Sequence, residues 1–97
     1  MIQWKLETLK SRANDKLAAQ ARKRGVKHKK ITYRVISEET GIALSSLANI
    51  GPNKTTRAQF NTIEMLLDYF SQLLEEELEI GDILEYVPEK KNEGENG

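Results

Sequence analysis

The 97-residue chain contains no cysteine, only two prolines and a single histidine. Without cysteine there is no disulfide, no thiol nucleophile and no cysteine-based zinc site, which fits a protein of the reducing cytoplasm. No apolar run approaches the roughly 20 residues that span a bilayer, and the N-terminus lacks the apolar core of a signal peptide. These absences predict a soluble, cytoplasmic protein without a membrane partner.

Groups that could support catalysis or hold a cofactor are also scarce. His28, the only histidine, lies in a run of cations, and Ser45 and Ser46 have no base close to them in the sequence. The clustered glutamates lack the histidine, cysteine or regularly spaced aspartate that would complete a metal cage, and there is no glycine-rich phosphate loop. We therefore expect no enzymatic activity, no cofactor and no metal ion.

The length of the chain suits one small domain with a single core. Residues 89–97 contain no apolar side chain and are expected to form a disordered polar tail, so we place the domain at residues 1–88. Apolar and polar residues alternate over residues 2–6 and again over residues 84–88, as they do in strands. This alternation is compatible with a two-stranded pairing of the two ends.

Two long stretches have apolar residues at helical spacing. The first runs from Leu6 to a helix end at Gly25, and the second follows a predicted capping box at Asn61–Glu64. The second stripe consists of Ile63, Leu66, Leu67, Phe70, Leu73, Leu74 and Leu78. It can pack into the core, or its second half can form a dimer seam. The glutamates within residues 75–79 crowd the end of this helix, where the helix dipole disfavours anions, and a basic surface such as residues 12–30 would relieve them.

The net charge of zero hides a strong asymmetry between the two halves of the chain. Residues 1–57 hold 13 Lys and Arg against 4 Asp and Glu, a net charge of +9, whereas residues 58–97 hold 2 against 11, a net charge of −9. Such asymmetry indicates nucleic-acid binding or contact between oppositely charged faces. Residues 22–30 alone carry six Lys or Arg. This segment can contact DNA, contact a protein partner or remain a solvated cationic loop.

Residues 32–57 have the pattern of two short helices joined at a glycine. Thr32 can cap the first helix with its hydroxyl, and Gly41 stands where a left-handed residue commonly ends a helix. Ile42 can fill the corner between the helices. Leu47 and Ile50 lie three residues apart on one face of the second helix. The pattern therefore predicts a helix-turn-helix whose second helix enters the major groove of DNA.

The polar residues of this region are of types that bind DNA. The outward positions of the second helix give the candidate base-reading residues Leu44, Ser45, Ser46 and Asn49. Asn can bond N6 and N7 of adenine together, Ser can bond several base edges, and Leu can touch a thymine methyl group. Pro52 ends the helix, and the hydroxyls and cations of the loop that follows suit phosphate contacts. The candidate contacts to the DNA backbone are Thr32, Tyr33, Asn53, Lys54, Thr55, Arg57, Arg22, Lys23 and Arg24.

The segment resembles the helix-turn-helix of Cro and the phage repressors, known as the XRE family. The residues that match its running pattern are Thr32, Val35, Thr40, Gly41, Ile42, Ser45, Leu47, Ile50, Lys54, Thr55 and Arg57. The opening MIQWKL and the closing GDILEYVP also resemble the ends of short bacterial members. The resemblance implies an all-α, five-helix Cro/repressor-like domain with a lengthened basic first helix and a lengthened acidic fourth helix. It also favours the pairing of the two ends as a small two-stranded sheet.

The chain departs from the family pattern at three single positions and at residues 51–53, where Gly-Pro-Asn replaces a more regular helix end. Ile36 stands where the family usually has alanine, which requires wider packing between the helices. Ala43 replaces the Ser or Thr that caps the second helix, a loss of about 0.5 to 2 kcal/mol of local stability. Leu44 occupies a position where relatives often carry a polar base-reading residue. The last two changes weaken the reading end of the helix.

Two classes of function follow from these observations. The resemblance implies a homodimeric transcription regulator, most simply a repressor, that binds an inverted-repeat operator in double-stranded DNA. The alternative is an antitoxin-like interaction module whose acidic helix neutralises a basic protein partner. The candidate dimer seam is formed by Leu73, Leu74, Leu78, Ile80, Ile83 and Val87.

Overall fold

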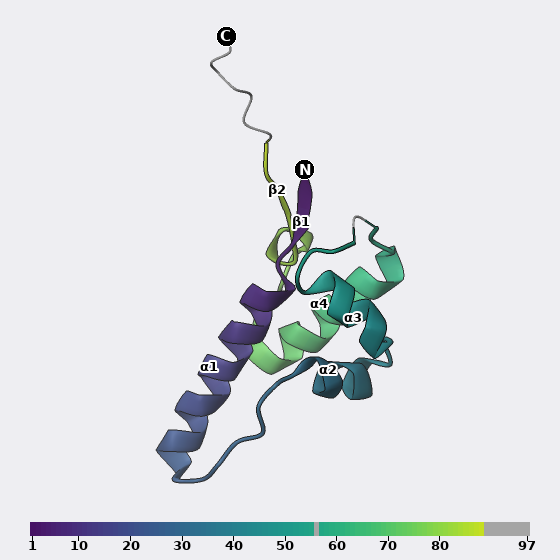
Figure 1. Cartoon of the computed structure of the whole chain (residues 1–97). Coiled ribbons are helices and arrows are strands. Elements are labelled where there is room, and N and C mark those ends of the chain that lie inside the picture. The colour runs from purple at the N-terminus through teal and green to yellow at the C-terminus, as the bar shows by residue number, and fades with distance from the viewer. Residues whose placement is uncertain (56, 89–97) are drawn as a thin grey trace.

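A computed structural model describes residues 1–55 and 57–88 of the chain (Figure 1). In chain order, the elements are β1 (Ile2–Trp4), α1 (Leu6–Arg24), α2 (Tyr33–Thr40), α3 (Leu44–Ile50), α4 (Phe60–Leu74), the 3-10 turn η1 (Ile80–Asp82) and β2 (Leu84–Tyr86). The described chain is thus mainly helical with a small two-stranded sheet. The expectation of five helices is not confirmed for these residues, which contain four helices and, after α4, the single turn η1. The predicted tail, 89–97, lies outside the described residues.

The first helix has the bounds that the sequence predicts. It ends at Gly25, whose φ of 69° is left-handed and whose N–H bonds back to the last turn. The last turn is basic, which suits the negative pole of the helix dipole. Leu6, Leu9 and Ala13 are buried along one face, whereas Ala21 is the only buried residue in the last two turns. The end of α1 therefore extends beyond the main core (Figure 1).

Helices α2 and α3 are the two short helices that the sequence predicts over residues 32–57, and Gly41 lies between them. The Thr32 hydroxyl accepts a hydrogen bond from the Val35 N–H at 3.3 Å, and Gly41 ends α2 with a φ of 84°. Ile42 is buried in the turn between the helices. As expected, Ala43 provides no side-chain cap to α3. Gly51 follows α3 directly and packs against Tyr33. A Cβ at Gly51 would collide with the Tyr33 hydroxyl group.

The bounds of α4 correct two predictions. The helix begins at Phe60 with Gln59 as its N-cap and without a side-chain cap, so the predicted capping box at Asn61–Glu64 does not form. It ends at Leu74, because Glu75 takes a left-handed φ of 57°. The acidic run therefore follows α4 instead of lengthening it. This ending separates the glutamates from the helix dipole, which disfavours anions at the C-terminus.

Cations of α1 stabilise this early ending of α4. Lys16 Nζ donates to the Leu74 carbonyl at 2.6 Å and to Glu75 Oε1 at 3.1 Å. Arg12 Nη2 lies 2.7 Å from both carboxylate oxygens of Glu76. The expectation that a basic surface meets the glutamates is thus confirmed for α1 of the same chain.

The two ends of the chain pair as predicted. Strands β1 and β2 are antiparallel, with Ile2 opposite Tyr86 and Trp4 opposite Leu84. The sheet lies at the end of the molecule opposite the tip of α1 (Figure 1). One core lies between the sheet, the helices and η1. Its fully buried large side chains are Phe70, Leu6, Leu9, Ile36, Leu47, Leu66 and Ile83.

Candidate nucleic-acid interface

Helix α3 has one buried face and one exposed face. Leu47 and Ile50 are buried in the core. The four predicted base-reading residues, Leu44, Ser45, Ser46 and Asn49, are all exposed. Ser45 and Asn49 are four residues apart, which places their side chains next to each other on the helix surface. The structure therefore brings the predicted residues together on the outside of the second helix of the motif.

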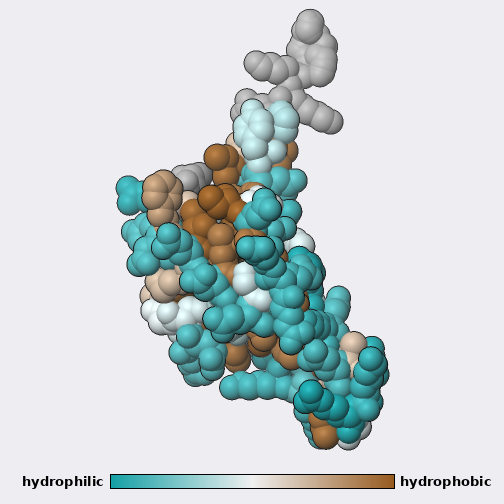
Figure 2. Space-filling model, turned by 180° about the vertical axis from the view of Figure 1, so that it is seen from behind, coloured by the Kyte–Doolittle hydropathy of each residue, from teal (hydrophilic) through white to brown (hydrophobic). Residues whose placement is uncertain are grey.

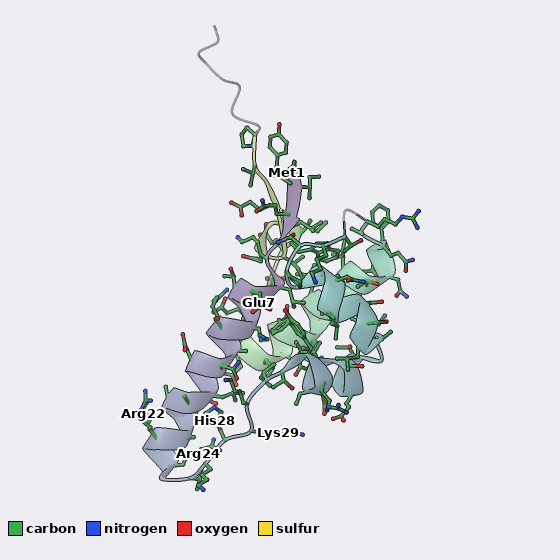
Figure 3. The ribbon with its side chains drawn as sticks, viewed as in Figure 1. Met1, Glu7, Arg22, Arg24, His28 and Lys29 are labelled. Carbon is green, nitrogen blue, oxygen red and sulfur yellow. The ribbon has the colours of Figure 1, made fainter. Side chains whose placement is uncertain are left out.

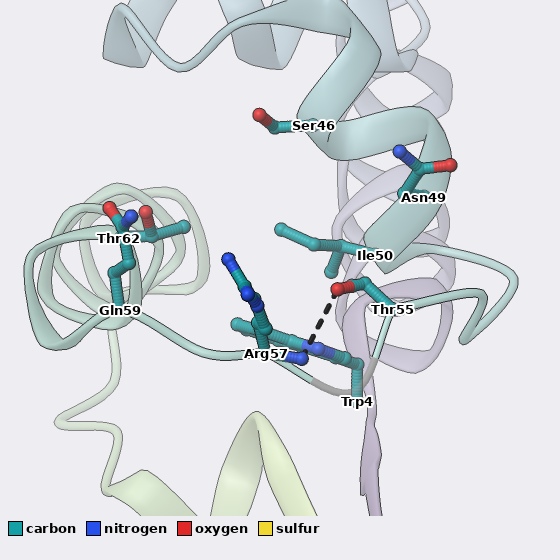
Figure 4. Close-up of a pocket in the computed structure, with 8 residues that line it drawn as sticks. All are labelled: Trp4, Ser46, Asn49, Ile50, Thr55, Arg57, Gln59 and Thr62. Carbon is teal, nitrogen blue, oxygen red and sulfur yellow. Dashed lines mark hydrogen bonds between the residues drawn. The ribbon is translucent and has the colours of Figure 1, made fainter.

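A polar hollow adjoins this exposed face (Figure 4). Its volume is about 180 Å³, and it lies between α3, the loop after α3 and the start of α4. Trp4 and Ile50 form its apolar lining, and the polar residues around it are Ser46, Asn49, Thr55, Arg57, Gln59 and Thr62. Figure 4 shows the Arg57 side chain extending into the hollow between α3 and α4.

The groups around Arg57 are suited to an anion. The Arg57 N–H donates to the Thr55 hydroxyl at 3.1 Å, which fixes the backbone beside the hollow. Within the part of the chain that the structure describes, Arg57 forms no ion pair. Hydroxyl, amide and guanidinium groups together are the usual partners of a phosphate oxygen. The hollow can therefore accept a phosphate next to the exposed face of α3.

Other predicted backbone contacts have partners inside the chain. The Asn53 side chain bonds to the backbone of Trp4, and the Thr32 hydroxyl caps α2. The Tyr33 hydroxyl donates to Glu7, and Lys10 Nζ lies 4.3 Å from the centre of the Tyr33 ring. The polar side-chain atoms of Asn53 and Tyr33 are bonded within the chain, so both residues have a structural role beside the DNA contact predicted for them. Lys54 and Arg57 are exposed, and Thr55 is half-buried.

The cations at the end of α1 form a separate group, which we call the basic tip and define as residues 22–30. All nine residues are exposed. Arg22, Arg24 and His28 lie together at the far end of α1 (Figure 3). After the tip, the side chain of Asn14 fixes Ile31 through hydrogen bonds to its N–H and carbonyl at 2.7 Å and 3.1 Å. The tip is thus held to α1 but lies apart from α3 in Figure 1.

The predicted dimer seam is largely taken up by the core. Leu74 and Ile83 are buried within the chain, and Leu73 and Leu78 pack against the same core. The seam prediction is therefore wrong for Leu74 and Ile83. The physical reason is the early end of α4, after which the chain turns back; the Leu78 N–H donates to the Ser71 hydroxyl at 3.3 Å. Of the remaining two residues, Ile80 is exposed and Val87 is half-buried.

Sequence reasoning missed several residues of the hollow. Trp4 lies about fifty positions before the loop that it contacts, so no local spacing could reveal it. Gln59 is the N-cap of α4, and Thr62 lies in the first turn of this helix. The sequence predicts the start of the helix at Asn61 instead, so it does not identify either residue. Asn53 was predicted to contact the DNA backbone because it belongs to the loop whose hydroxyls and cations suit phosphate contacts. Only the tertiary contact between this loop and β1 identifies its partner.

The described residues were also compared with the requirements of a metal site and of a membrane-spanning helix. Over residues 1–55 and 57–88, no three His, Asp or Glu side chains lie close enough together to hold a metal ion. In the same ranges, no helix combines the length and the apolar character needed to cross a membrane. Compared with known protein families, curated proteins and solved structures, the chain matches none.

Proposed function

We propose that the protein is a sequence-specific DNA-binding regulator of transcription that places α3 in the major groove. The observation that carries this proposal is the junction of the exposed face of α3 with the hollow around Arg57. A base-reading surface beside an anion site is the arrangement that a helix in the major groove requires, because phosphates flank the groove. An α-helix with its side chains is about 10 to 12 Å in diameter, which fits a major groove about 12 Å wide.

Each part of the surface has a defined role in this proposal. Asn49 donates to and accepts from one adenine, and Ser45 bonds a neighbouring base edge. Leu44, at the start of α3, contacts a thymine methyl group. Arg57 binds a phosphate in the hollow, with Lys54 beside it in the same loop. Base contacts provide the specificity, and phosphate contacts fix the orientation.

The charge distribution supports the same proposal. Arg12 and Lys16 pair with Glu76 and Glu75, so part of the acidic half is neutralised by α1. The basic tip provides a second region of positive potential, which would attract DNA at a distance. In this proposal the protein is a repressor that acts in the cytoplasm by occupying its operator.

Selection of bound DNA from a random library tests this proposal directly. We expect enrichment of one sequence motif by the wild-type protein and loss of that motif for the double variant Ser45→Ala, Asn49→Ala. The double variant Lys27→Ala, Lys29→Ala serves as the matched control; it removes cations of the basic tip and should keep the motif. Absence of any enriched motif with folded wild-type protein would overturn the proposal.

An antitoxin-like interaction module is the second candidate. The uncapped start of α3 and the exposed Leu44 favour it, because both weaken DNA reading and offer an apolar contact. Its proposed acidic surface is reduced, however, by the ion pairs of Glu75 and Glu76. The Glu79 carboxylate is also engaged, since it accepts a hydrogen bond from the Asp82 N–H in the capping box of η1. DNA binding is therefore the function that the geometry supports best.

A further inference from the structure

A second hollow lies between α1, α2, α4 and the loop that joins α1 to α2. Its volume is about 290 Å³, which is near the lower end of the range for ligand pockets. We call it the side cleft and define it by the residues that line it: Leu17, His28, Lys29, Ile31, Val35, Glu39, Tyr69 and Leu73. None of these residues lines the hollow around Arg57. The side cleft is therefore a separate candidate site.

The floor of the side cleft is apolar. Ile31 is buried, and the half-buried residues that pack against the core beside it are Leu17, Val35, Tyr69 and Leu73. Seen from behind, apolar side chains gather at the junction between the main body of the molecule and the tip of α1 (Figure 2). Such a floor favours an apolar ligand group, because contact removes both apolar surfaces from water.

Local spacing and hydrogen bonds hold the walls of the cleft in place. On α2, Val35 lies four residues before Glu39, so the two side chains share one face of the helix. On the loop, Ile31 is fixed by the Asn14 side chain, which accepts from its N–H at 2.7 Å and donates to its carbonyl at 3.1 Å. The cleft is thus largely formed before a ligand arrives, which lowers the cost of ordering it on binding.

Charges of opposite sign lie on the rim of the cleft. Glu39 is exposed on α2, whereas His28 and Lys29 are exposed on the loop after α1. The Lys29 side chain extends from this loop away from α1 (Figure 3). Among residues 1–55 and 57–88, none of these three side chains takes part in an ion pair. The rim therefore offers one anionic and one cationic side to a ligand.

The anionic side of the rim suits an ammonium group. Burial raises the pKa of the Tyr69 phenol, and the charge of Glu39 raises it further. The carboxylate thus acts on the ring, and both groups line the same cleft. A carboxylate and the face of an aromatic ring each attract a cation. An ammonium group placed here is stabilised by both.

We propose that the side cleft binds a free apolar amino acid. The ammonium group of the ligand lies at Glu39 and Tyr69. Its carboxylate lies at Lys29 and the imidazole N–H of His28, and its apolar side chain lies on the floor. A ligand with a single charge fits the rim less well, because an anion would face Glu39 and an amine would face Lys29.

This binding goes beyond the proposed DNA binding and does not depend on it. Glu39 belongs to α2, which packs against α3, whereas His28 and Lys29 belong to the basic tip. An amino acid bound between them joins α2 to the tip and is placed to act as an effector, since a ligand that prefers one arrangement of two surfaces couples them. Binding measured without DNA can fail while DNA selection succeeds, and the reverse also holds.

NMR titration of the isotope-labelled full chain with L-phenylalanine or L-leucine is the first test. A ligand of this size in an open cleft is expected to reach a dissociation constant of about 1 mM. We expect saturable shifts of the backbone amide signals of Val35, Glu39, Tyr69 and Leu73 at about 10 mM ligand. The absence of a saturable shift with either amino acid, or shifts confined to residues outside the cleft, would overturn the proposal.

Two analogues of phenylalanine separate the contributions of the two charges. Phenethylamine lacks the carboxylate, and phenylpropanoate lacks the ammonium group. Each should bind about three- to fivefold more weakly than phenylalanine, because an exposed ion pair contributes only modestly. Equal affinity of the three compounds would contradict recognition of both charges and overturn the proposal.

Variants of the rim assign each charge to a side chain. Glu39→Gln should weaken the binding of phenylalanine and phenethylamine about three- to fivefold and should not weaken that of phenylpropanoate. Lys29→Gln should weaken the binding of phenylalanine and phenylpropanoate and should not weaken that of phenethylamine. Glu38→Gln and Lys30→Gln are the matched controls, because these neighbours are exposed and do not line the cleft. Equal losses in the rim variants and their controls would contradict the proposed site.

Discussion

The side-chain amide of Asn53 bonds to both backbone polar groups of Trp4, at 2.6 Å and 3.1 Å. Asn53 has a φ of 60°, a conformation that asparagine tolerates better than most residues. The contact fixes the loop after α3 against β1. Because Trp4 also lines the hollow, it holds the loop with Arg57 at a defined position relative to α3.

We expect Asn53→Asp to lower the free energy of unfolding by about 1 to 3 kcal/mol. Aspartate keeps the size and the accepting oxygen but removes the donor, so the Trp4 carbonyl loses its partner. Asn49→Asp is the matched control, because Asn49 is exposed on α3, and this change should have an effect below about 0.5 kcal/mol. Urea denaturation of both variants measures the difference. Equal stability of the two variants would show that the Asn53 amide contributes little.

The contact between Lys16 and the end of α4 leads to a second prediction. Lys16→Met removes a cation that bonds the Leu74 carbonyl and pairs with Glu75. The loss should be about 0.5 to 2 kcal/mol, because the cation also interacts with the helix dipole. Arg12→Met should cost at most about 1 kcal/mol, since its pair with Glu76 is substantially exposed.

The dependence on salt concentration distinguishes the contribution of Lys16 from that of Arg12. Screening should reduce the effect of Arg12→Met strongly at high ionic strength and that of Lys16→Met only in part, because a bond to a carbonyl remains. Lys27→Met, a change of an exposed cation in the loop after α1, is the control and should be nearly neutral. Thermal unfolding in low and high salt provides the comparison. An effect of Lys16→Met that disappears in high salt would show that the carbonyl bond is unimportant.

Local features of the fold were predictable from the sequence. The cap at Thr32, the left-handed turn at Gly41 and the end of α1 at Gly25 each depend on residues within one helical turn. The inward positions Leu47 and Ile50 follow from helical spacing alone. The exposed face of α3 is the remainder of the same helix. For these reasons the candidate base-reading residues were identified correctly as exposed neighbours.

Features that depend on distant residues could not be predicted in the same way. The apolar stripe continues to Leu78, but α4 ends at Leu74 because Lys16, far away in sequence, stabilises that end. The roles of Asn53 and Trp4 arise only when the termini pair and bring β1 to the loop. Helical periodicity predicts which residues can face the core, but it does not predict where the helix ends and the chain turns back.

Tyr69 provides a prediction on pH. Burial raises the pKa of Tyr69 above its ordinary value, and the charge of Glu39 raises it further. The folded state therefore favours the neutral phenol, and this contribution to stability is complete below about pH 10, the ordinary tyrosine pKa. It is lost as the pH rises from there through the higher pKa of the folded state. Tyr69→Phe should lose less stability than wild type over this alkaline range.

Denaturant unfolding from neutral pH to above about pH 10 measures this difference. Wild type and Tyr69→Phe differ in this one phenol, so the difference between their curves reports Tyr69. Tyr86→Phe is the control, because it removes the same hydroxyl group from an exposed side chain, and its stability should follow that of wild type. Parallel curves for wild type and Tyr69→Phe would contradict a raised pKa.

Phosphate contacts should be visible in the salt dependence of DNA binding. If Arg57 binds one phosphate in the hollow, Arg57→Ala should weaken binding to all DNA sequences and reduce the slope of log affinity against log salt by about 0.9. Neutralising Arg22, Lys23 and Arg24 to glutamine should reduce it by a similar amount for each phosphate that the basic tip contacts. An unchanged slope in the second variant would place the tip away from DNA and leave it a solvated cationic segment.

Base reading by α3 is separated from these effects by comparing two DNAs. Asn49→Ala should cost about 1 to 3 kcal/mol on the selected site, because a two-bond contact to adenine is lost, and much less on random DNA. Asn14→Ala is not a suitable control, since Asn14 fixes the backbone of Ile31. Asn61→Ala is suitable, because Asn61 is exposed on α4 and does not cap it. Fluorescence anisotropy on both DNAs gives the two affinities for each variant. Equal losses for Asn49→Ala on the selected and the random DNA would assign Asn49 to the backbone and leave the reading of bases to Leu44, Ser45 and Ser46.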